Sequence, residues 1–418
     1  MNVNARELAA NFDIEKLTPE FYADPYPTYR ALREHEPIKR LPNGSWFLTR
    51  YDDLISAYKT TKLFSSDKKK EFLPKYGNSL LYEHHTTSLV FNDPPAHTRV
   101  RRLIMGALSP RAIAEMEPDL TLLVDRLLDA LAAKRNIDLI EDFAAAIPIQ
   151  VIGNLLDVPI EERDPLRDWS LAILGALEPV IGPEAFARGN DAVRDFLAYL
   201  EILVEGRRAK PGNPERDVLT RLIGGEGGER LTAKELQHNC IFLLNAGHET
   251  TTNLIGNALV ALSENPAQKK RLIDNPGLIK TAVEEFLRFE SSNQLGNRIT
   301  TEALEIGGIA LPANTSVTLC IGAANRDPRQ FENPETLDIG RMPNRHLAFG
   351  TGAHQCAGMA LARLEGAIAI SRFLARFPSY ELTAPPVRGG RVRFRGFLSI
   401  PCTVGDKPST SLRNMHAL

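Results

Sequence analysis

The sequence is poor in cysteine, in excess charge and in long apolar runs, and each shortage excludes a class of protein. The four cysteines among 418 residues form no CxxC pair, so neither a disulfide framework nor a zinc finger is expected. A formal net charge of −2 gives no argument for nucleic-acid binding. The most apolar stretch, residues 241–244, is bracketed by Glu235 and Glu249 too closely for a membrane span. Charged residues within the first sixteen argue against a signal peptide or anchor, so we expect a cytoplasmic protein that binds no membrane.

The chain is long enough to raise the question of domain number. It is 43% hydrophobic and 24% charged, an ordinary globular composition. Chains of this length usually fold into more than one domain, each with its own hydrophobic core. No repeat or interdomain linker interrupts this chain, so a single domain over residues 1–418 needs an organising centre such as a large cofactor.

Helical patterns cover most of the chain. Apolar residues recur at three-to-four spacing across 95–222, and further helices are expected near 27–36, 276–289 and 357–377. A hairpin is predicted where 38–41 and 46–49 flank Asn43-Gly44. We therefore expect a mainly α fold with a small antiparallel β part.

One predicted helix is unusually long. A capping box, Thr232 to Glu235, begins a helical pattern that continues to Glu264 and stops at Asn265-Pro266. At the rise of an α-helix, 32 residues span roughly 48 Å. A helix of that length crosses a whole domain and can organise one core around itself.

The segment with the most specific chemistry is Phe349-Gly350-Thr351-Gly352-Ala353-His354-Gln355-Cys356-Ala357-Gly358. Its glycines permit tight turns close to a bulky partner. We expect Cys356 directly before a helix, where free amides and the helix dipole favour a thiolate. One cysteine cannot build a zinc site, but one axial ligand suffices for haem iron, because the porphyrin supplies four nitrogens. The plainer alternative is a buried structural cysteine near a helix cap.

This segment resembles the FGxGxHxCxG signature of the cytochrome P450 family, in which a cysteine thiolate ligates haem iron. The resemblance implies the cytochrome P450-like haem-binding fold, with heme b (iron protoporphyrin IX) as cofactor and Cys356 as axial ligand. It also implies that Phe349, His354 and Gly358 lie against the cofactor. It extends from the hairpin at Trp46 to the end of the last helix.

A second motif, Ala246-Gly247-His248-Glu249-Thr250-Thr251, lies midway along the long helix. Gly247 is costly in a helix interior and needs a local cause, while a threonine hydroxyl can bond the carbonyl four residues back. The stretch resembles the family's AGx(D/E)T(T/S) motif. That likeness implies that Ala246 and Gly247 border the cofactor, that Thr250 assists oxygen activation, and that Glu249 feeds protons from solvent. The alternative is a helix with ordinary polar faces.

Glu285 and Arg288, three residues apart on one helix face, match the family's ExxR pair. Glu205 and Arg208 form a second instance, but only Glu285–Arg288 lies between the two motifs above. The resemblance implies that Arg341 completes a structural network that holds the cysteine loop.

Basic residues at helical spacing suggest how the two haem propionates are bound. His97 and Arg101 lie i, i+4 after Pro94-Pro95 and resemble the family's HxxxR. Arg99 and Arg102 project from other faces, where they are surface residues or receive an acidic redox partner. The propionate partners implied by the resemblance are His97, Arg101, Arg298 and His354.

The substrate pocket is less well defined. Where many family members carry a proline after the ExxR arginine, residues 289–294 here are polar, which suggests a substrate with a hydrogen-bonding group. A turn whose side chains face away explains the same residues equally well. The candidate lining residues are Leu89, Val90, Leu243, Ala246, Ser291, Ser292 and Asn293.

The resemblance implies a monomeric monooxygenase that inserts one atom of dioxygen into a small organic substrate, by hydroxylation or oxidative dealkylation. Electrons are expected from a separate ferredoxin or flavodoxin. A peroxide-driven peroxygenase is one alternative, although such members usually lose the acid–threonine pair that Glu249 and Thr250 supply here. A non-catalytic haem-thiolate protein that binds or senses a small ligand is the other.

Overall fold

The computed structural model describes residues 4–214, 217–225 and 227–405. Its helices are α1 (Ala5–Ala10), α2 (Pro19–Ala23), α3 (Tyr26–His35), α4 (Tyr51–Lys59), α5 (Lys69–Tyr76), α6 (Leu80–Thr87), α7 (Ala96–Ala107), α8 (Pro110–Lys134), α9 (Ala146–Leu155), α10 (Asp164–Gly175), α11 (Pro183–Ala209), α12 (Val218–Gly224), α13 (Ala233–Glu264), α14 (Pro266–Asp274), α15 (Ile279–Phe289), α16 (Ile321–Ala324) and α17 (Met359–Arg376). Its strands are β1 (Ile38–Arg40), β2 (Trp46–Leu48), β3 (Phe64–Ser65), β4 (Asn136–Asp138), β5 (Leu295–Thr300), β6 (Leu304–Ile306), β7 (Ile309–Leu311), β8 (Ser316–Cys320), β9 (Glu381–Leu382), β10 (Val387–Arg388), β11 (Phe397–Ser399) and β12 (Pro401–Thr403). The mainly helical fold class predicted from the sequence is confirmed.

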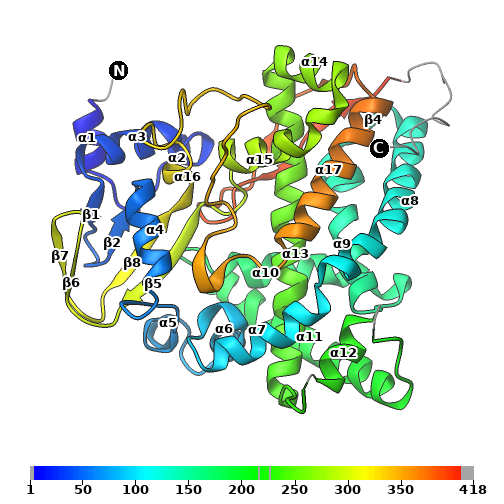
Figure 1. The fold of residues 1–418 in the computed structure, drawn as a ribbon, viewed down its shortest axis with the longest axis horizontal. Helices are drawn as coiled ribbons and strands as arrows, with labels where there is room; N and C mark the ends of the chain where they lie inside the picture. Colours follow the sequence, from blue (N-terminus) through cyan, green and yellow to red (C-terminus); the bar gives the residue numbers. More distant parts are fainter. Residues whose placement is uncertain (1–3, 215–216, 226, 406–418) are drawn as a thin grey trace.

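Helix α13 runs through the helical part of the molecule, with α17 and α15 beside it (Figure 1). Its predicted capping box is present: the Glu235 amide donates to Thr232 Oγ1 at 3.1 Å, and the Thr232 amide donates to Glu235 Oε2 at 2.9 Å. Residues 251–262 are buried without interruption. A helix buried on all sides is part of the core, so α13 is the element around which the neighbouring helices pack.

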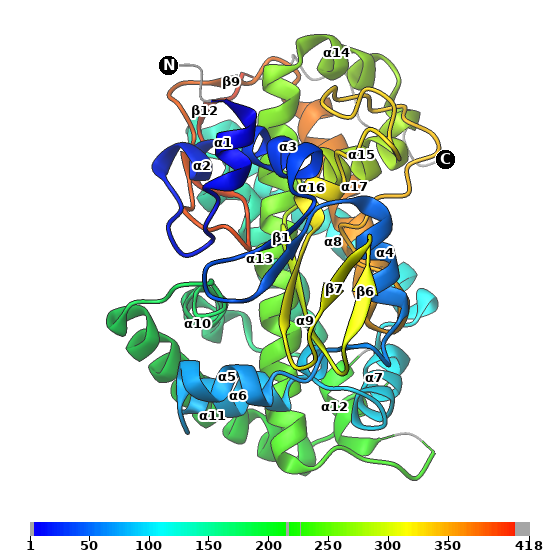
Figure 2. The ribbon, with the colours of Figure 1, turned by 90° about the vertical axis from the view of Figure 1, so that its left-hand side faces the viewer.

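The strands of the largest sheet and the β6–β7 pair lie beside the N-terminal helices, on the left of Figure 1, whereas β4 lies at the upper right. The predicted hairpin forms, with Ile38 opposite Leu48 and Arg40 opposite Trp46. It joins a sheet of order β1-β2-β8-β5-β3, in which β2 and β8 pair in parallel and the other described pairs are antiparallel. Helices α5, α6 and α11 lie below this sheet in Figure 2.

The start of α17 differs from the sequence prediction. The helix begins at Met359 with Gly358 as its N-cap, so Ala357 and Gly358 separate Cys356 from it. The glycine at the cap ends the turn of the cysteine loop before regular helix begins. Among the described residues, no helix combines the length and the apolar character needed to cross a membrane.

Candidate active site

The loop before α17 presents Cys356 from a tight turn. Gly350 and Gly352 have φ angles of 61° and 74°, a region that favours glycine. A Cβ on Gly352 would lie 2.7 Å from the carbonyl oxygen of Tyr58, so only glycine fits there. The Cys356 amide donates to the Phe349 carbonyl at 2.9 Å and closes the turn. Backbone geometry therefore fixes the position of the sulfur.

Burial raises the pKa of the Cys356 thiol, against opposing effects of a hydrogen bond from the Gly358 amide and of the charges on Arg101 and Arg363. A metal ion that binds a thiol deprotonates it outright, so burial does not prevent ligation. Among the described residues, no three His, Cys, Asp or Glu are placed to hold a metal ion. Cys356 therefore suits a metal that brings its other ligands with it.

Beside this loop lies a cluster of basic side chains that we call the propionate cluster: His97, Arg101, Arg298 and His354. The rings of His97 and His354 are 3.9 Å apart, and Arg101 Nη2 donates to the Gln355 carbonyl at 2.6 Å. Burial lowers the pKa of His354 to about 3, helped by the charges of Arg298, His97 and Arg101. These groups therefore crowd together from α7, β5 and the cysteine loop.

Arg101 and Arg298 each donate to one backbone carbonyl, but other polar atoms of the propionate cluster have no partner among the described residues. Both ring nitrogens of His97 and Nε of Arg298 are buried with no hydrogen-bond partner. Asp93 is near enough to favour the charge on Arg298, but its carboxylate accepts from the Ser66 amide and the Ser65 hydroxyl. Buried polar groups without partners are costly. A ligand with two carboxylates would satisfy them, so the residues present fit the two propionates of a haem.

The second motif opens one face of α13. Ala246 is exposed although it lies mid-helix, and the Thr250 hydroxyl donates to its carbonyl at 2.8 Å. Gly247 has the local cause expected for it: a Cβ there would lie 2.2 Å from Cδ1 of Ile152 on α9. Close packing on one side and an accessible alanine on the other leave the Ala246–Thr250 face free for a ligand.

Glu249 is buried and ion-paired. Its Oε1 accepts from Nη1 of Arg391 at 2.6 Å, and its Oε2 is buried without a partner. Burial raises the pKa of Glu249 to about 7, against the opposing charge of Arg391. Sequence reasoning missed Arg391, because it lies 142 residues away in a turn that carries no motif.

The structure joins Glu285, Arg288 and Arg341 in one buried network. Arg288 donates to both carboxylate oxygens of Glu285 at 2.8 Å, and Arg341 Nε lies 3.1 Å from Oε2. Arg288 also donates to the Asn325 carbonyl, and Asn325 Oδ1 accepts from the Leu347 amide at the start of the cysteine loop. The network therefore anchors that loop.

The candidate lining residues divide into two kinds. Leu89 is buried, Val90 and Leu243 are half-buried, and Ala246 is exposed. In the polar segment, Ser291 donates to the Leu287 carbonyl at 2.8 Å, and Asn293 accepts from the Leu295 amide at 3.4 Å. The Ser291 hydroxyl also accepts from Asn325 Nδ2 at 2.8 Å, whereas the Ser292 hydroxyl is buried without a partner.

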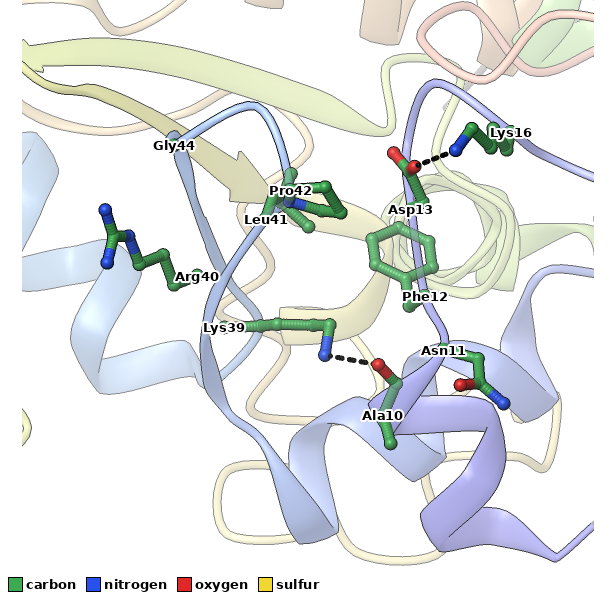
Figure 3. A pocket seen from close by; sticks show the side chains of 10 residues that line it. All are labelled: Ala10, Asn11, Phe12, Asp13, Lys16, Lys39, Arg40, Leu41, Pro42 and Gly44. Atoms are coloured by element: carbon green, nitrogen blue, oxygen red, sulfur yellow. Dashed lines mark hydrogen bonds and ion pairs between the residues drawn. The ribbon is translucent and has the colours of Figure 1, made fainter.

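Two other regions of the molecule carry charged side chains near the surface. Arg99 and Arg102 pair with Glu235 and Glu229, as expected for residues on the outer faces of α7. An open groove of about 580 Å³ lies between the N-terminal segment and the β1–β2 hairpin (Figure 3). In it, Lys39 Nζ donates to the Ala10 carbonyl at 3.0 Å, and Lys16 pairs with Asp13. No lining group is buried without a partner, so this groove has no sign of a specific ligand.

A lone cysteine, a cationic cluster that fits two carboxylates and a central helix with an acid–threonine pair are the features of a haem-thiolate enzyme. Comparisons with known proteins agree. The family model for cytochrome P450 matches residues 174–387. The biotin biosynthesis cytochrome P450 of Bacillus subtilis is 37% identical over 366 residues, 87% of this chain and 91% of that protein. Vitamin D(3) 25-hydroxylase of Pseudonocardia autotrophica is 37% identical over 93% of this chain and 95% of its own length.

Solved structures give the same result. The crystal structure of P450BioI in complex with hexadec-9Z-enoic acid ligated acyl carrier protein superposes with a TM-score of 0.87 and 35% identity, covering 92% of this chain and 99% of that one. The chain therefore belongs to the cytochrome P450 family, and heme b is its cofactor. It is a monooxygenase that acts on a small-molecule substrate with O2 and electrons from a redox partner.

Proposed function

We propose that Cys356 is the axial ligand of the haem, and that the enzyme inserts one oxygen atom of O2 into its substrate by hydroxylation or oxidative dealkylation. The observation that carries the proposal is that the loop presenting Cys356 lies beside a propionate cluster with unpartnered buried nitrogens. His97, Arg101, Arg298 and His354 would bind the propionates. Phe349, Gly358, Ala246 and Gly247 would border the porphyrin.

When bound, the haem supplies the oxygen-activating redox chemistry. Protons are the contribution of this chain. A carboxyl whose pKa is near 7 can both give and accept a proton at neutral pH, and Glu249 has that value. Arg391, whose side chain is 20% exposed, links Glu249 to the surface. Thr250, one residue on, would hold and pass the proton at its hydroxyl on the open face of α13.

The lining of the site would bind the apolar body of the substrate and exclude water. Leu89, Val90, Leu243 and Ala246 present apolar surface, and Ser292 offers an unpaired hydroxyl. Ser291 and Asn293 would act indirectly, by fixing the turn after α15. Excluding water strengthens every polar interaction made inside the site.

The electron donor would be a separate ferredoxin or flavodoxin. Within the described ranges, the sheets are small and none is the doubly wound parallel sheet that binds a flavin or nicotinamide cofactor. We further propose that residues 1–418 form one haem domain organised by α13, and that the protein acts as a cytoplasmic monomer.

The thiolate is tested by the carbon monoxide difference spectrum of the dithionite-reduced protein. We expect the strongly red-shifted Soret band of a thiolate-ligated haem, and its loss in Cys356→Ser. Cys320→Ser, which removes a buried cysteine at the end of β8, is the matched control and should keep the band. A band at the shorter wavelength of histidine ligation would contradict the proposal.

The oxygen chemistry is tested with NADPH, a surrogate reductase and either a ferredoxin or a flavodoxin. Hexadec-9Z-enoic acid and vitamin D3, taken from the names of similar proteins, are the first substrates to try. Label from 18O2 should enter the product. Thr250→Ala and Glu249→Gln should keep consuming NADPH but release peroxide in place of product. Wild-type product formation in both variants would show that the pair carries no protons.

A further inference from the structure

A second group of cations is centred on Arg393, in the turn between β10 and β11. Arg393 Nη1 donates to the Leu295 carbonyl on β5 at 2.9 Å, and its Nε donates to the Leu177 carbonyl after α10 at 3.2 Å. Its side chain therefore spans from the α10–α11 connection to the strand that carries Arg298. The guanidinium therefore lies at the start of β5, three residues before Arg298 of the propionate cluster.

Two lysines approach Arg393 from the α5 region. Lys75 Nζ donates to the Glu178 carbonyl at 2.5 Å, and the fully buried Lys68 lies 2.8 Å from Glu71. Burial lowers the pKa of both lysines to about 8, and in both cases the charge of Arg393 lowers it further. Lys68 Nζ also donates to Asn297, two residues from the Leu295 carbonyl that binds Arg393, and Lys75 and Arg393 both bond to Glu178, so the three residues are close neighbours.

The charges of this group do not balance. Lys68, Lys75 and Arg393 face two carboxylates, Glu71 and Glu178, so one positive charge is left over. Glu178 is also occupied, since its oxygens accept from the amides of Val392 and Arg393. Among the residues that the structure describes, neither Lys75 nor Arg393 makes an ion pair, whereas most arginines nearby do.

An unpartnered polar group points to a ligand at the same place. Nε2 of His85 is buried without a hydrogen-bond partner. Burial lowers the pKa of His85 to about 3, with further contributions from the charges of Lys75 and Arg393. A neutral imidazole can donate one hydrogen bond. This group therefore offers an anion two cations without an ion pair, Lys75 and Arg393, and one neutral donor. His85 also precedes the candidate lining residue Leu89 by four positions.

We propose that Arg393, Lys75 and Lys68 form the anion-binding end of the substrate site, and that the substrate is a monocarboxylate with an apolar body. This inference rests on the proposed function, because it places the oxidised carbon between the haem and this anion site. The leftover single charge matches one carboxylate. The haem propionates have their own partners in the propionate cluster, so they do not account for it.

The test uses ligands that are anchored to the haem whatever the natural substrate is. A series of ω-(imidazol-1-yl)alkanoic acids of increasing chain length is titrated beside their methyl esters, and binding is followed by the Soret shift of nitrogen ligation. At the chain length that reaches Arg393, the acid should bind about ten-fold more tightly than its ester, as expected of a charge-assisted hydrogen bond. Raising the salt concentration should weaken the binding of the acid but not of the ester.

Variants assign the preference to residues. Arg393→Gln should abolish it, Arg393→Lys should restore part of it, and Lys75→Gln should reduce it even if Arg393→Gln does not fold. Lys69→Gln, which removes an exposed charge at the start of α5 that pairs with Asp67, is the control and should keep the preference for the acid. If Arg393 only held the α10–α11 connection in place, its substitution would change the binding of acid and ester equally.

Two results would overturn the inference in different ways. Equal binding of acid and ester at every chain length, or a preference that survives both Arg393→Gln and Lys75→Gln, would reject the anion site and leave the proposed function intact. Absence of the thiolate carbon monoxide band in the wild-type protein would reject the proposed function and this inference together.

Discussion

Two groups of buried charges meet the loop that carries Cys356, and they differ in how well they are satisfied. In the network of Glu285, Arg288 and Arg341, the buried carboxylate accepts hydrogen bonds from both arginines. Arg288 also donates to backbone carbonyls. In the propionate cluster, His97 and Arg298 keep buried nitrogens without partners. Both groups are buried at a cost. In the Glu285 network, hydrogen bonds within the fold offset the cost of burying the charges. In the propionate cluster, that cost is offset only when a ligand binds. This difference separates charges with a structural role from charges that bind a ligand.

The largest effect should come from breaking the satisfied network. Arg288→Ala would leave Glu285 buried and half-paired, which costs about 3–5 kcal/mol of unfolding free energy. Urea unfolding of the purified variant measures it. The control is Arg208→Ala, whose pair with Glu205 is 2.5 Å long but exposed and should be worth less than about 1 kcal/mol. Similar losses in both variants would show that burial does not set the value of an ExxR pair here.

Glu365 on α17 sharpens the comparison, because it is a buried carboxyl that makes no ion pair with any residue the structure describes. Burial raises its pKa to about 8 from 4.5. Between these values the folded state binds more protons than the unfolded state, so unfolding free energy falls as pH rises. Glu365→Gln does not titrate and should be more stable than wild type by about 3 kcal/mol at pH 7, with no gain below pH 4.5. Thermal unfolding across this window measures the difference, and the exposed Glu201→Gln should show none.

A smaller effect is expected at the unsatisfied cluster, and it should appear in a different measurement. Arg298→Gln removes a charge-assisted bond to the cofactor, so haem should transfer to apomyoglobin about ten-fold faster. Haem-free protein should be no less stable, because the variant removes a buried cation whose Nε has no hydrogen-bond partner. Arg99→Gln, on the outer face of α7, is the control for haem loss. If Arg298→Gln destabilised the haem-free protein as Arg288→Ala does, the two groups would not differ in kind.

Features encoded by neighbouring residues could be predicted from the sequence. The capping box set the start of α13 and Asn265-Pro266 its end, because both signals act within a turn. The glycines of the cysteine loop predicted a tight turn for the same reason. Arg341 could also be predicted, but only from the resemblance to the family, since nothing local ties it to Glu285.

Features that depend on distant parts of the chain could not be predicted. Arg391 and Arg393 reach Glu249 and Leu295 from a turn without a motif, through contacts that only the tertiary fold creates. The role of the polar segment after α15 was also undecided. The structure shows Ser291 bonded to Leu287 and Asn325 while the Ser292 hydroxyl has no partner, and neighbouring serines in a sequence give no sign of which way each will face.

The smallest effect on stability should come from a pair outside both groups. Arg102 and Glu229 are about half exposed, so a double-mutant cycle should assign their pair less than about 1 kcal/mol. Their position on the outside of α7 leaves Arg102 available to an acidic electron donor, whose encounter depends on charge complementarity. Arg102→Gln should therefore slow reduction by an acidic ferredoxin at low salt, and the difference should vanish at high salt. Arg111→Gln, which breaks an exposed pair with Glu115 on α8, is the control. Equal slowing in both variants would mean that the donor responds to net charge alone, and that Arg102 belongs with neither the structural nor the binding charges.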